Sequence, residues 1–139
     1  MQKQFENRLV AIVNKDIELG VAMNALAHAT IGLGAQLNSE TLLLTDYVDQ
    51  NGNVYPHISQ MPFIILKGKS GEIRKCYANA KSQGVMCGVF INTMTGGTYQ
   101  EQLDNTRVTA TENLTYYVLV LFGREEIVKP LTKSFSLYK

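Results

Sequence analysis

The sequence predicts a single α/β domain over residues 1–139, and three observations lead to this prediction. Apolar runs of strand length alternate along the chain with segments that favour helix. The first run, residues 9–13, is apolar throughout, which is typical of a strand covered on both faces. The composition, with 45% hydrophobic and 18% charged residues in 139, is that of a globular chain long enough for one core.

The segment after this first strand predicts a helix over residues 20–37, because it is rich in Ala, Met and Leu. Small residues recur within it at steps of three, four and three, at Ala22, Ala25, Ala29 and Gly32. This spacing places them on one helix face, where small side chains let the helix lie close against the first strand. A strand followed by such a helix opens a βα unit.

The next segment predicts a β-hairpin. Residues 41–47 form a strand pattern, and residues 49–53 are dense in turn-forming residues and contain Asn-Gly. Residues 54–58 supply the returning arm, and Pro56 confines that arm to an edge because proline has no backbone donor.

A second strand-and-helix unit follows. Residues 62–67 are an apolar run of strand length, and Ser70 is a candidate N-cap for a helix over residues 71–82. Gly84 then occupies the position of a helix C-cap glycine, and residues 85–91 predict another strand.

The last third begins with a loop rich in Thr and Gly over residues 92–99, and residues 98–105 predict one or two helical turns. Residues 115–122 are the clearest strand pattern of the chain. Residues 124–128 begin a short final helix before Pro130.

Charge and targeting features restrict the partners. Thirteen basic and twelve acidic residues give a net charge of +1, which argues against nucleic acid, including tRNA, as a partner. Lys129, Lys133 and Lys139 predict a weakly basic, solvated tail. Residues 1–8 are polar and lack a signal-peptide core, and no apolar run approaches the roughly 18 residues of a membrane span, so we expect a cytoplasmic protein without membrane contact.

Metal and cofactor chemistry lacks support in the sequence. Cys76, Cys87, His28 and His57 are scattered, whereas a zinc site needs about four grouped ligands. The Gly-Lys-Ser sequence at 68–70 does not complete a phosphate-binding loop, whose first glycine is missing. The sequence therefore predicts no metal and no cofactor.

A first candidate site lies where the first helix begins. Asn24 and His28 are one helical turn apart, so both side chains emerge on the same face, and Lys15 and Asp16 lie in the loop before the helix. Helix N-termini that follow a strand of an α/β sheet favour anions, and Gly20 allows close backbone approach. The alternative is that Asn24 and His28 are polar residues hydrogen-bonded against a neighbouring element.

The loop over residues 92–98 is the second part of this candidate site, because Asn92, Thr93 and Thr95 follow a predicted strand and loops there often line a crevice. A plain solvent loop is the alternative reading. The first hypothesis is therefore a small polar or anionic ligand held by both regions. If a reaction occurs there, His28 is the general acid or base and Asn24 orients it or the ligand.

Two separated stretches carry a family resemblance. Residues 8–13 followed by 20–29, and residues 121–125 followed by 130–139, resemble the bacterial and archaeal domain-of-unknown-function family number two thousand. The strand at 62–67 and the helix after it occur in matching order, so the resemblance covers nearly the whole chain. It implies the fold of type 2 peptidyl-tRNA hydrolases, a three-layer α/β/α sandwich around a small mixed sheet.

Compared with those hydrolases, Gly20 matches the glycine of their Gly-Lys pair, and Ala27 and His28 match their Ala-His pair. Val21 stands where they carry lysine, and Asn92 falls near their acidic residue. An isopropyl group cannot replace a cation, and loss of one well-placed electrostatic group commonly costs about 100-fold in rate. The resemblance thus implies, for any enzyme activity, a hydrolase weakened at the lysine position.

Three functions stay open from the sequence. The first is the small-ligand protein described above, the second is a weak peptidyl-tRNA hydrolase-like enzyme, and the third is a non-catalytic homodimeric interaction module. The third would use apolar strand or helix surface that so small a sheet leaves uncovered.

Overall fold

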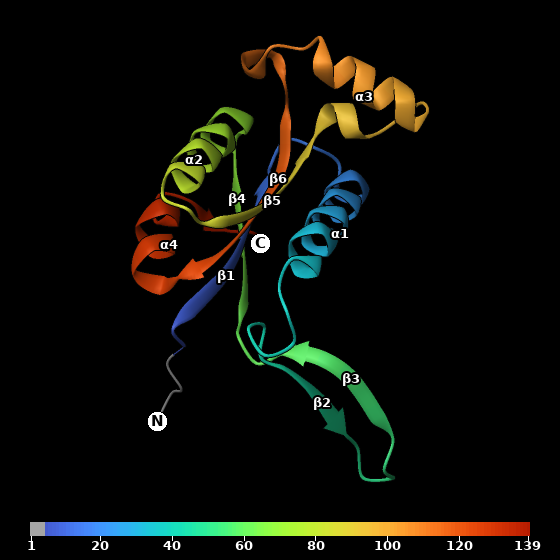
Figure 1. Ribbon diagram of the computed structural model, residues 1–139, viewed down its shortest axis with the longest axis vertical. Helices are drawn as coiled ribbons and strands as arrows, with labels where there is room; N and C mark the ends of the chain where they lie inside the picture. The colour runs from blue at the N-terminus through green and yellow to red at the C-terminus, as the bar shows by residue number, and fades with distance from the viewer. Residues whose placement is uncertain (1–4) are drawn as a thin grey trace.

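The computed structural model describes residues 5–139, so the first four residues of the polar segment 1–8 lie outside the described part (Figure 1). Within it, strands and helices alternate in this order: β1 (Asn7–Asn14), α1 (Leu19–Ala35), β2 (Leu44–Val48), β3 (Val54–Ser59), β4 (Phe63–Gly68), α2 (Ser70–Ser82), β5 (Met86–Ile91), η1 (Asn92–Met94), α3 (Tyr99–Arg107), η2 (Thr111–Asn113), β6 (Tyr116–Arg124), α4 (Glu125–Thr132) and β7 (Ser136–Leu137).

The main sheet has five strands in the order β5-β6-β1-β4-β7 and is mixed. β1 runs parallel to β4 and antiparallel to β6, so that Ala11 pairs with Ile65 on one side and with Val120 on the other. Residues 9–13 are all buried, which confirms the predicted strand covered on both faces.

Helix α1 covers one face of the sheet, and α2 and α4 cover the other (Figure 1). Ala22, Ala25 and Ala29 of α1 are buried against the sheet, as their spacing predicts. Gly32 is exposed instead of continuing the row, and Leu33 is buried in its place. One helical turn is longer than three residues, so a further step of four from Ala29 stays on the buried face. A step of three, to Gly32, turns away from it.

Helix α2 starts one residue earlier than expected. Ser70 is its first residue and Lys69 precedes it as the N-cap, so the predicted capping role of Ser70 is wrong. The Ser70 hydroxyl instead accepts the backbone N–H of Tyr116 at 2.8 Å, which ties α2 to the start of β6. Gly84 has φ +74°, the left-handed conformation typical of a glycine that follows a helix.

Strands β2 and β3 form a separate two-stranded hairpin that projects from the body of the protein (Figure 1). Its turn is held by Asp49, whose Oδ1 accepts the backbone N–H groups of Asn51 and Asn53, each at 2.9 Å. The strand predicted at 41–47 begins only at Leu44, because residues 39–43 form turns, with Leu42 N–H bonded to the Asn38 carbonyl.

The C-terminal region departs from the sequence prediction twice. Pro130 lies inside α4 rather than after it; the acceptor that loses its donor is the carbonyl of Glu126, and both residues are exposed, so solvent can replace that bond. The tail is also not wholly solvated, because β7 adds an edge strand to β4 and Tyr138 N–H donates to the Ile65 carbonyl at 2.9 Å. Lys133 and Lys139 are exposed, as predicted.

Helix α3 confirms the helical turns predicted over residues 98–105 and continues to Arg107. The predicted 92–99 loop begins with the turn η1, and Thr98 at its end caps α3 by accepting the Glu101 N–H at 3.2 Å. Among residues 5–139, every helix is too short or too polar to cross a bilayer.

Candidate functional site

The loop that leaves β1 is fixed from inside the protein. Asn14 is buried, donates to the Tyr116 carbonyl at 2.9 Å and accepts the Asp16 N–H at 2.8 Å. Lys15 N–H donates to the Gly68 carbonyl at 3.0 Å, and the Lys15 ammonium pairs with the Asp16 carboxylate at 3.4 Å on the surface. The buried amide of Asn14, which the sequence analysis did not single out, thus positions two of the predicted site residues.

Asn24 and His28 lie on the outer side of α1 and are exposed. The His28 ring approaches the Phe90 ring with centroids 5.7 Å apart, and Phe90 stacks in turn on Tyr117 at 6.1 Å. A Cβ at Gly20 would meet nothing within 4 Å. Gly20, Asn24 and His28 therefore share one exposed face along the first half of α1. Neither Asn24 nor His28 lines the cavity described below.

The polar groups of the 92–98 loop are engaged with the protein itself. Asn92 Oδ1 accepts the Thr115 N–H at 2.9 Å, and the hydroxyls of Thr93 and Thr106 are hydrogen-bonded to each other at 2.6 Å. Thr95 is exposed. These bonds hold η1 against α3 and the segment before β6, so two of the three predicted ligand groups stabilise the loop.

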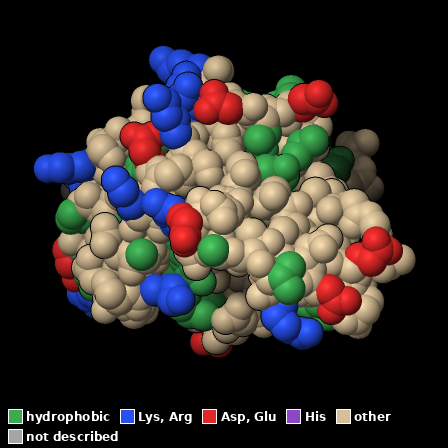
Figure 2. Space-filling model, turned by 90° about the horizontal axis from the view of Figure 1, so that it is seen from above, with side chains coloured by type: hydrophobic (Ala, Val, Ile, Leu, Met, Phe, Trp, Pro, Cys, Tyr) green, Lys and Arg blue, Asp and Glu red, His purple; other side chains and the backbone are tan. Residues whose placement is uncertain are grey.

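Charges on this end of the molecule are mixed. Figure 2 looks onto it from above, along the direction in which β1 and β4 end and α1 and α2 begin. Lys and Arg side chains gather towards one side, and Asp and Glu side chains lie both among them and opposite. Such a face lacks the continuous basic surface that a nucleic acid backbone binds.

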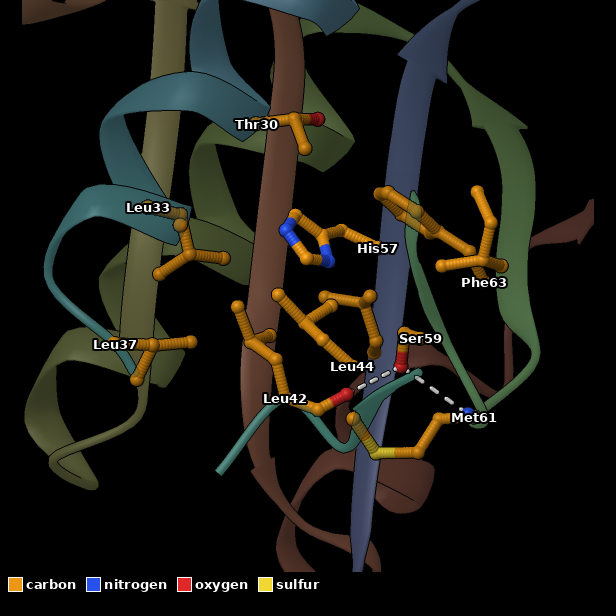
Figure 3. Close-up of a pocket in the computed structure, with 12 residues that line it drawn as sticks. Thr30, Leu33, Leu37, Leu42, Leu44, His57, Ser59, Met61 and Phe63 are labelled. Carbon is orange, nitrogen blue, oxygen red and sulfur yellow. Dashed lines mark hydrogen bonds between the residues drawn. The ribbon is translucent and has the colours of Figure 1, made fainter. Parts of the chain in front are cut away.

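A cavity of about 520 Å³ lies at the other end of α1, between this helix, the base of the β2–β3 hairpin and the first residues of β1 and β4 (Figure 3). Its walls are mainly apolar and are formed by Leu9, Thr30, Leu33, Gly34, Leu37, Leu42, Leu44, His57, Ile58, Ser59, Met61 and Phe63. The α1 members stand at spacings of three and four, so they share one helix face. The cavity is therefore at the amino end of the parallel strands, opposite the end at which the sequence predicts the site.

Two of the three polar side chains in this lining carry hydroxyl groups. The Ser59 hydroxyl donates to the Leu42 carbonyl at 2.6 Å and accepts the Met61 N–H at 3.1 Å, which closes the base of the hairpin. The Thr30 hydroxyl is buried and has no hydrogen-bond partner among the described residues.

The third polar side chain, His57, stands at the mouth of the cavity. The hairpin register shifts between Thr45 and Tyr47, so that Pro56 and His57 together lie opposite Asp46. His57 adopts φ +65°, and such a bulge redirects the side chain of the residue that it contains. His57 Nδ1 lies 2.9 Å from Asp46 Oδ1, and the same oxygen accepts the His57 backbone N–H at 3.2 Å.

The sequence suggests His57 only as a possible zinc ligand and gives no indication of this cavity. Proline inside a strand pattern is a signal for a bulge, and it could have drawn attention to residue 57. The apolar walls have no such signal, because they come from α1, the 37–44 connection and both strand starts. Among residues 5–139, no group of three or more His, Cys, Asp or Glu side chains could hold a metal ion.

Comparison with known proteins supports the family resemblance. The sequence model of a family described as "Protein of unknown function (DUF2000)" matches residues 7–139, which confirms the resemblance predicted above. A solved structure, that of the protein of unknown function Atu0240 from Agrobacterium tumefaciens strain C58, is similar with a TM-score of 0.83 and 20% identity. The match covers 98% of this chain and 100% of that one, and it shows the α/β fold. Among curated proteins nothing matches.

Proposed function

For this chain, which belongs to the family described as protein of unknown function (DUF2000), we propose that it binds a small, mainly apolar molecule in the cavity between α1 and the β2–β3 hairpin. The observation that carries this proposal is the cavity of about 520 Å³ with leucine, methionine and phenylalanine walls. Ligand sites are typically concave, mainly apolar and roughly 300–1,000 Å³ in volume.

Two glycines of α1 allow a test with a matched control. Gly34 lines the cavity and Gly32 is exposed outside it, and at both positions a Cβ would meet nothing within 4 Å. Leucine at 34 therefore fills the cavity, whereas leucine at 32 points to solvent. The probe is 4-propyltoluene, a small apolar molecule. We expect Gly34→Leu to weaken its binding about tenfold or more, because roughly 1.4 kcal/mol of apolar burial is lost.

Binding is measured by titration with NMR detection, using contacts between the probe and the Met61 methyl to locate it. Gly32→Leu should leave the affinity unchanged. Equal affinity in wild type and Gly34→Leu, or a probe located elsewhere, would overturn the proposal.

The polar-ligand site around Asn24 and His28 is a separate proposal. It is supported by the exposure of both side chains on one face of α1, next to the partly exposed Val21 at the position of the hydrolase lysine. A thermal-shift screen of small anions, repeated with His28→Ala, tests it, and any hit that persists in the variant is bound elsewhere. Turnover of a peptidyl-tRNA analogue at low salt tests the hydrolase hypothesis in the same preparation.

Self-association is a second candidate function, favoured by the surface of the hairpin. Tyr47, Val48, Val54 and Tyr55 each expose more than half of their surface, and an isolated two-stranded hairpin gains little stability in water. Helix α1 carries no Asp, Glu, Lys or Arg, so its outer side is a second surface of low charge on the same molecule. Two copies related by a twofold axis would each present both surfaces to the other.

Light scattering of the full chain tests this candidate. Tyr47→Lys should shift the mass towards the monomer, whereas Tyr99→Lys, on exposed α3, should leave it unchanged. A wild-type protein that stays monomeric at high concentration would contradict the proposal.

A further inference from the structure

We infer that the molecule bound in this cavity is an apolar body carrying one hydroxyl group, and that Nε2 of His57 accepts the hydrogen bond from this hydroxyl. The inference rests on the proposed function and adds the chemical class of the ligand and the residue that recognises it.

The first step concerns the tautomer of His57. Asp46 Oδ1 lies 2.9 Å from Nδ1, and a carboxylate oxygen can only accept a hydrogen bond, so Nδ1 carries the hydrogen. In the neutral imidazole the other nitrogen, Nε2, is then an unprotonated acceptor. An acceptor selects a ligand that donates a hydrogen bond, and an alcohol or phenol hydroxyl on a small apolar molecule is such a donor.

The second step concerns the direction of the ring. His57 and the adjacent Ile58 both line the cavity, although neighbouring residues of a regular strand point to opposite faces. Ser59 lines it as well, so three consecutive residues do, and the bulge opposite Asp46, with His57 at φ +65°, interrupts the regular alternation where this run begins. Figure 3 shows the far nitrogen of the imidazole turned towards the α1 wall that contains Leu33.

A non-glycine residue with positive φ costs free energy, and such strain concentrates at functional positions. Here Asp46 holds the strained residue twice, through its backbone N–H and through its ring. The His57 side chain is 72% exposed and gains little from packing, so its contacts with Asp46 are what hold it in place.

The third step is the inventory of polar groups in the lining. The hydroxyl of Ser59 has two internal partners, and the oxygen of Thr30 has almost no accessible surface for a ligand to contact. His57 is the remaining polar side chain among the lining residues, and the other walls are apolar. One hydrogen-bonding group on an otherwise apolar molecule therefore matches the site.

The test compares 4-propylphenol with 4-propyltoluene, which replaces the hydroxyl by a methyl group of similar size. Both are titrated into the full chain at about pH 8.5, above the ordinary titration range of histidine. We expect His57→Phe, which keeps a flat ring without nitrogens, to weaken 4-propylphenol about three- to tenfold, the worth of one hydrogen bond. The affinity for 4-propyltoluene should stay unchanged.

Two further variants serve as controls. His57→Asn lacks the ring acceptor but tolerates positive φ, so it should reproduce the effect if the phenylalanine variant folds poorly. His28→Phe alters the other histidine, outside the cavity, and should change neither affinity.

The outcomes separate the two proposals. Equal weakening of both probes, or no weakening of the phenol, overturns the role of His57 and leaves the cavity as an apolar binding site. Failure of both probes to bind the wild-type chain overturns the proposed function, and with it this inference.

Discussion

The backbone of Gly88 in β5 lies directly against the carbonyl group of Ala29 in α1, so closely that a Cβ at residue 88 would overlap the carbonyl oxygen. The same Cβ would also lie 3.3 Å from Cβ of Leu33. Close contact between α1 and the sheet therefore depends on small residues on both sides, alanine on the helix and glycine on the strand.

This contact predicts that Gly88→Ala destabilises the protein by about 1–3 kcal/mol, the usual cost of overpacking a well-packed core. Chemical denaturation measures the free energy of unfolding. Gly20→Ala is the matched control, because a Cβ there meets nothing and alanine favours helix, so it should raise stability by about 0.5–1 kcal/mol. Equal effects of the two substitutions would contradict the close approach.

The second prediction concerns the buried amide of Asn14, which joins the end of β1 to the start of β6 and to the loop at Asp16. Asn14→Ala leaves a buried carbonyl and an N–H without partners and should lower the free energy of unfolding by about 1–3 kcal/mol. Asn24→Ala removes an exposed asparagine and should change it by less than about 0.5 kcal/mol. Thermal and urea denaturation of both variants give the comparison.

The third prediction uses the buried hydroxyl of Thr30, which has no partner among residues 5–139. Thr30→Val keeps the shape and removes the unsatisfied group, so it should raise the free energy of unfolding by about 1 kcal/mol. Thr106→Val is the opposite case, since the Thr106 hydroxyl bonds to Thr93 at 2.6 Å and to the Gln102 carbonyl at 2.7 Å. That variant should be destabilised, and a loss of stability in Thr30→Val would show that its hydroxyl has a partner in solution.

The fourth prediction concerns the two thiols. Burial raises the pKa of Cys76 and of Cys87 from 9.0 to about 11, with the neighbouring thiol adding to the effect at Cys76. A rise of this size lowers the thiolate fraction at about pH 8 roughly 100-fold, so iodoacetamide should react far more slowly with the folded chain than with the chain in denaturant. Rapid alkylation of the folded protein would contradict the buried placement.

The same pKa values set the direction of the alkaline stability change. The unfolded chain loses its thiol protons near pH 9, whereas the folded chain keeps them up to about pH 11. Their contribution to stability is therefore fully present below pH 9 and is lost as the pH rises towards 11. Denaturation at pH 8 and at pH 10.5 should show a fall in stability that is smaller in Cys87→Ala.

The elements that carry local patterns agree with the sequence analysis. The apolar run at 9–13, the alanine spacing of α1 and the run before Gly123 each indicate their structure locally, because both faces of the two strands and one face of the helix meet the core. The errors occur where local preference is overruled. Ser70 bonds to Tyr116 rather than capping its own helix, and residues 136–137 join β4 because that edge offers free backbone groups.

By itself, the sequence determined the α/β class and the face that α1 turns to the sheet, since both follow from the order and periodicity of apolar residues. The family resemblance was also readable from the sequence, through the residues matched at 8–13, 20–29, 121–125 and 130–139. Tertiary structure alone decided that His57 meets Asp46 and that leucines from α1, the 37–44 connection and β1 enclose one space with Phe63 of β4. The cavity walls join residues far apart in the chain. The contact of His57 with Asp46 lies within one hairpin, but it depends on a bulge, which leaves no periodic signal.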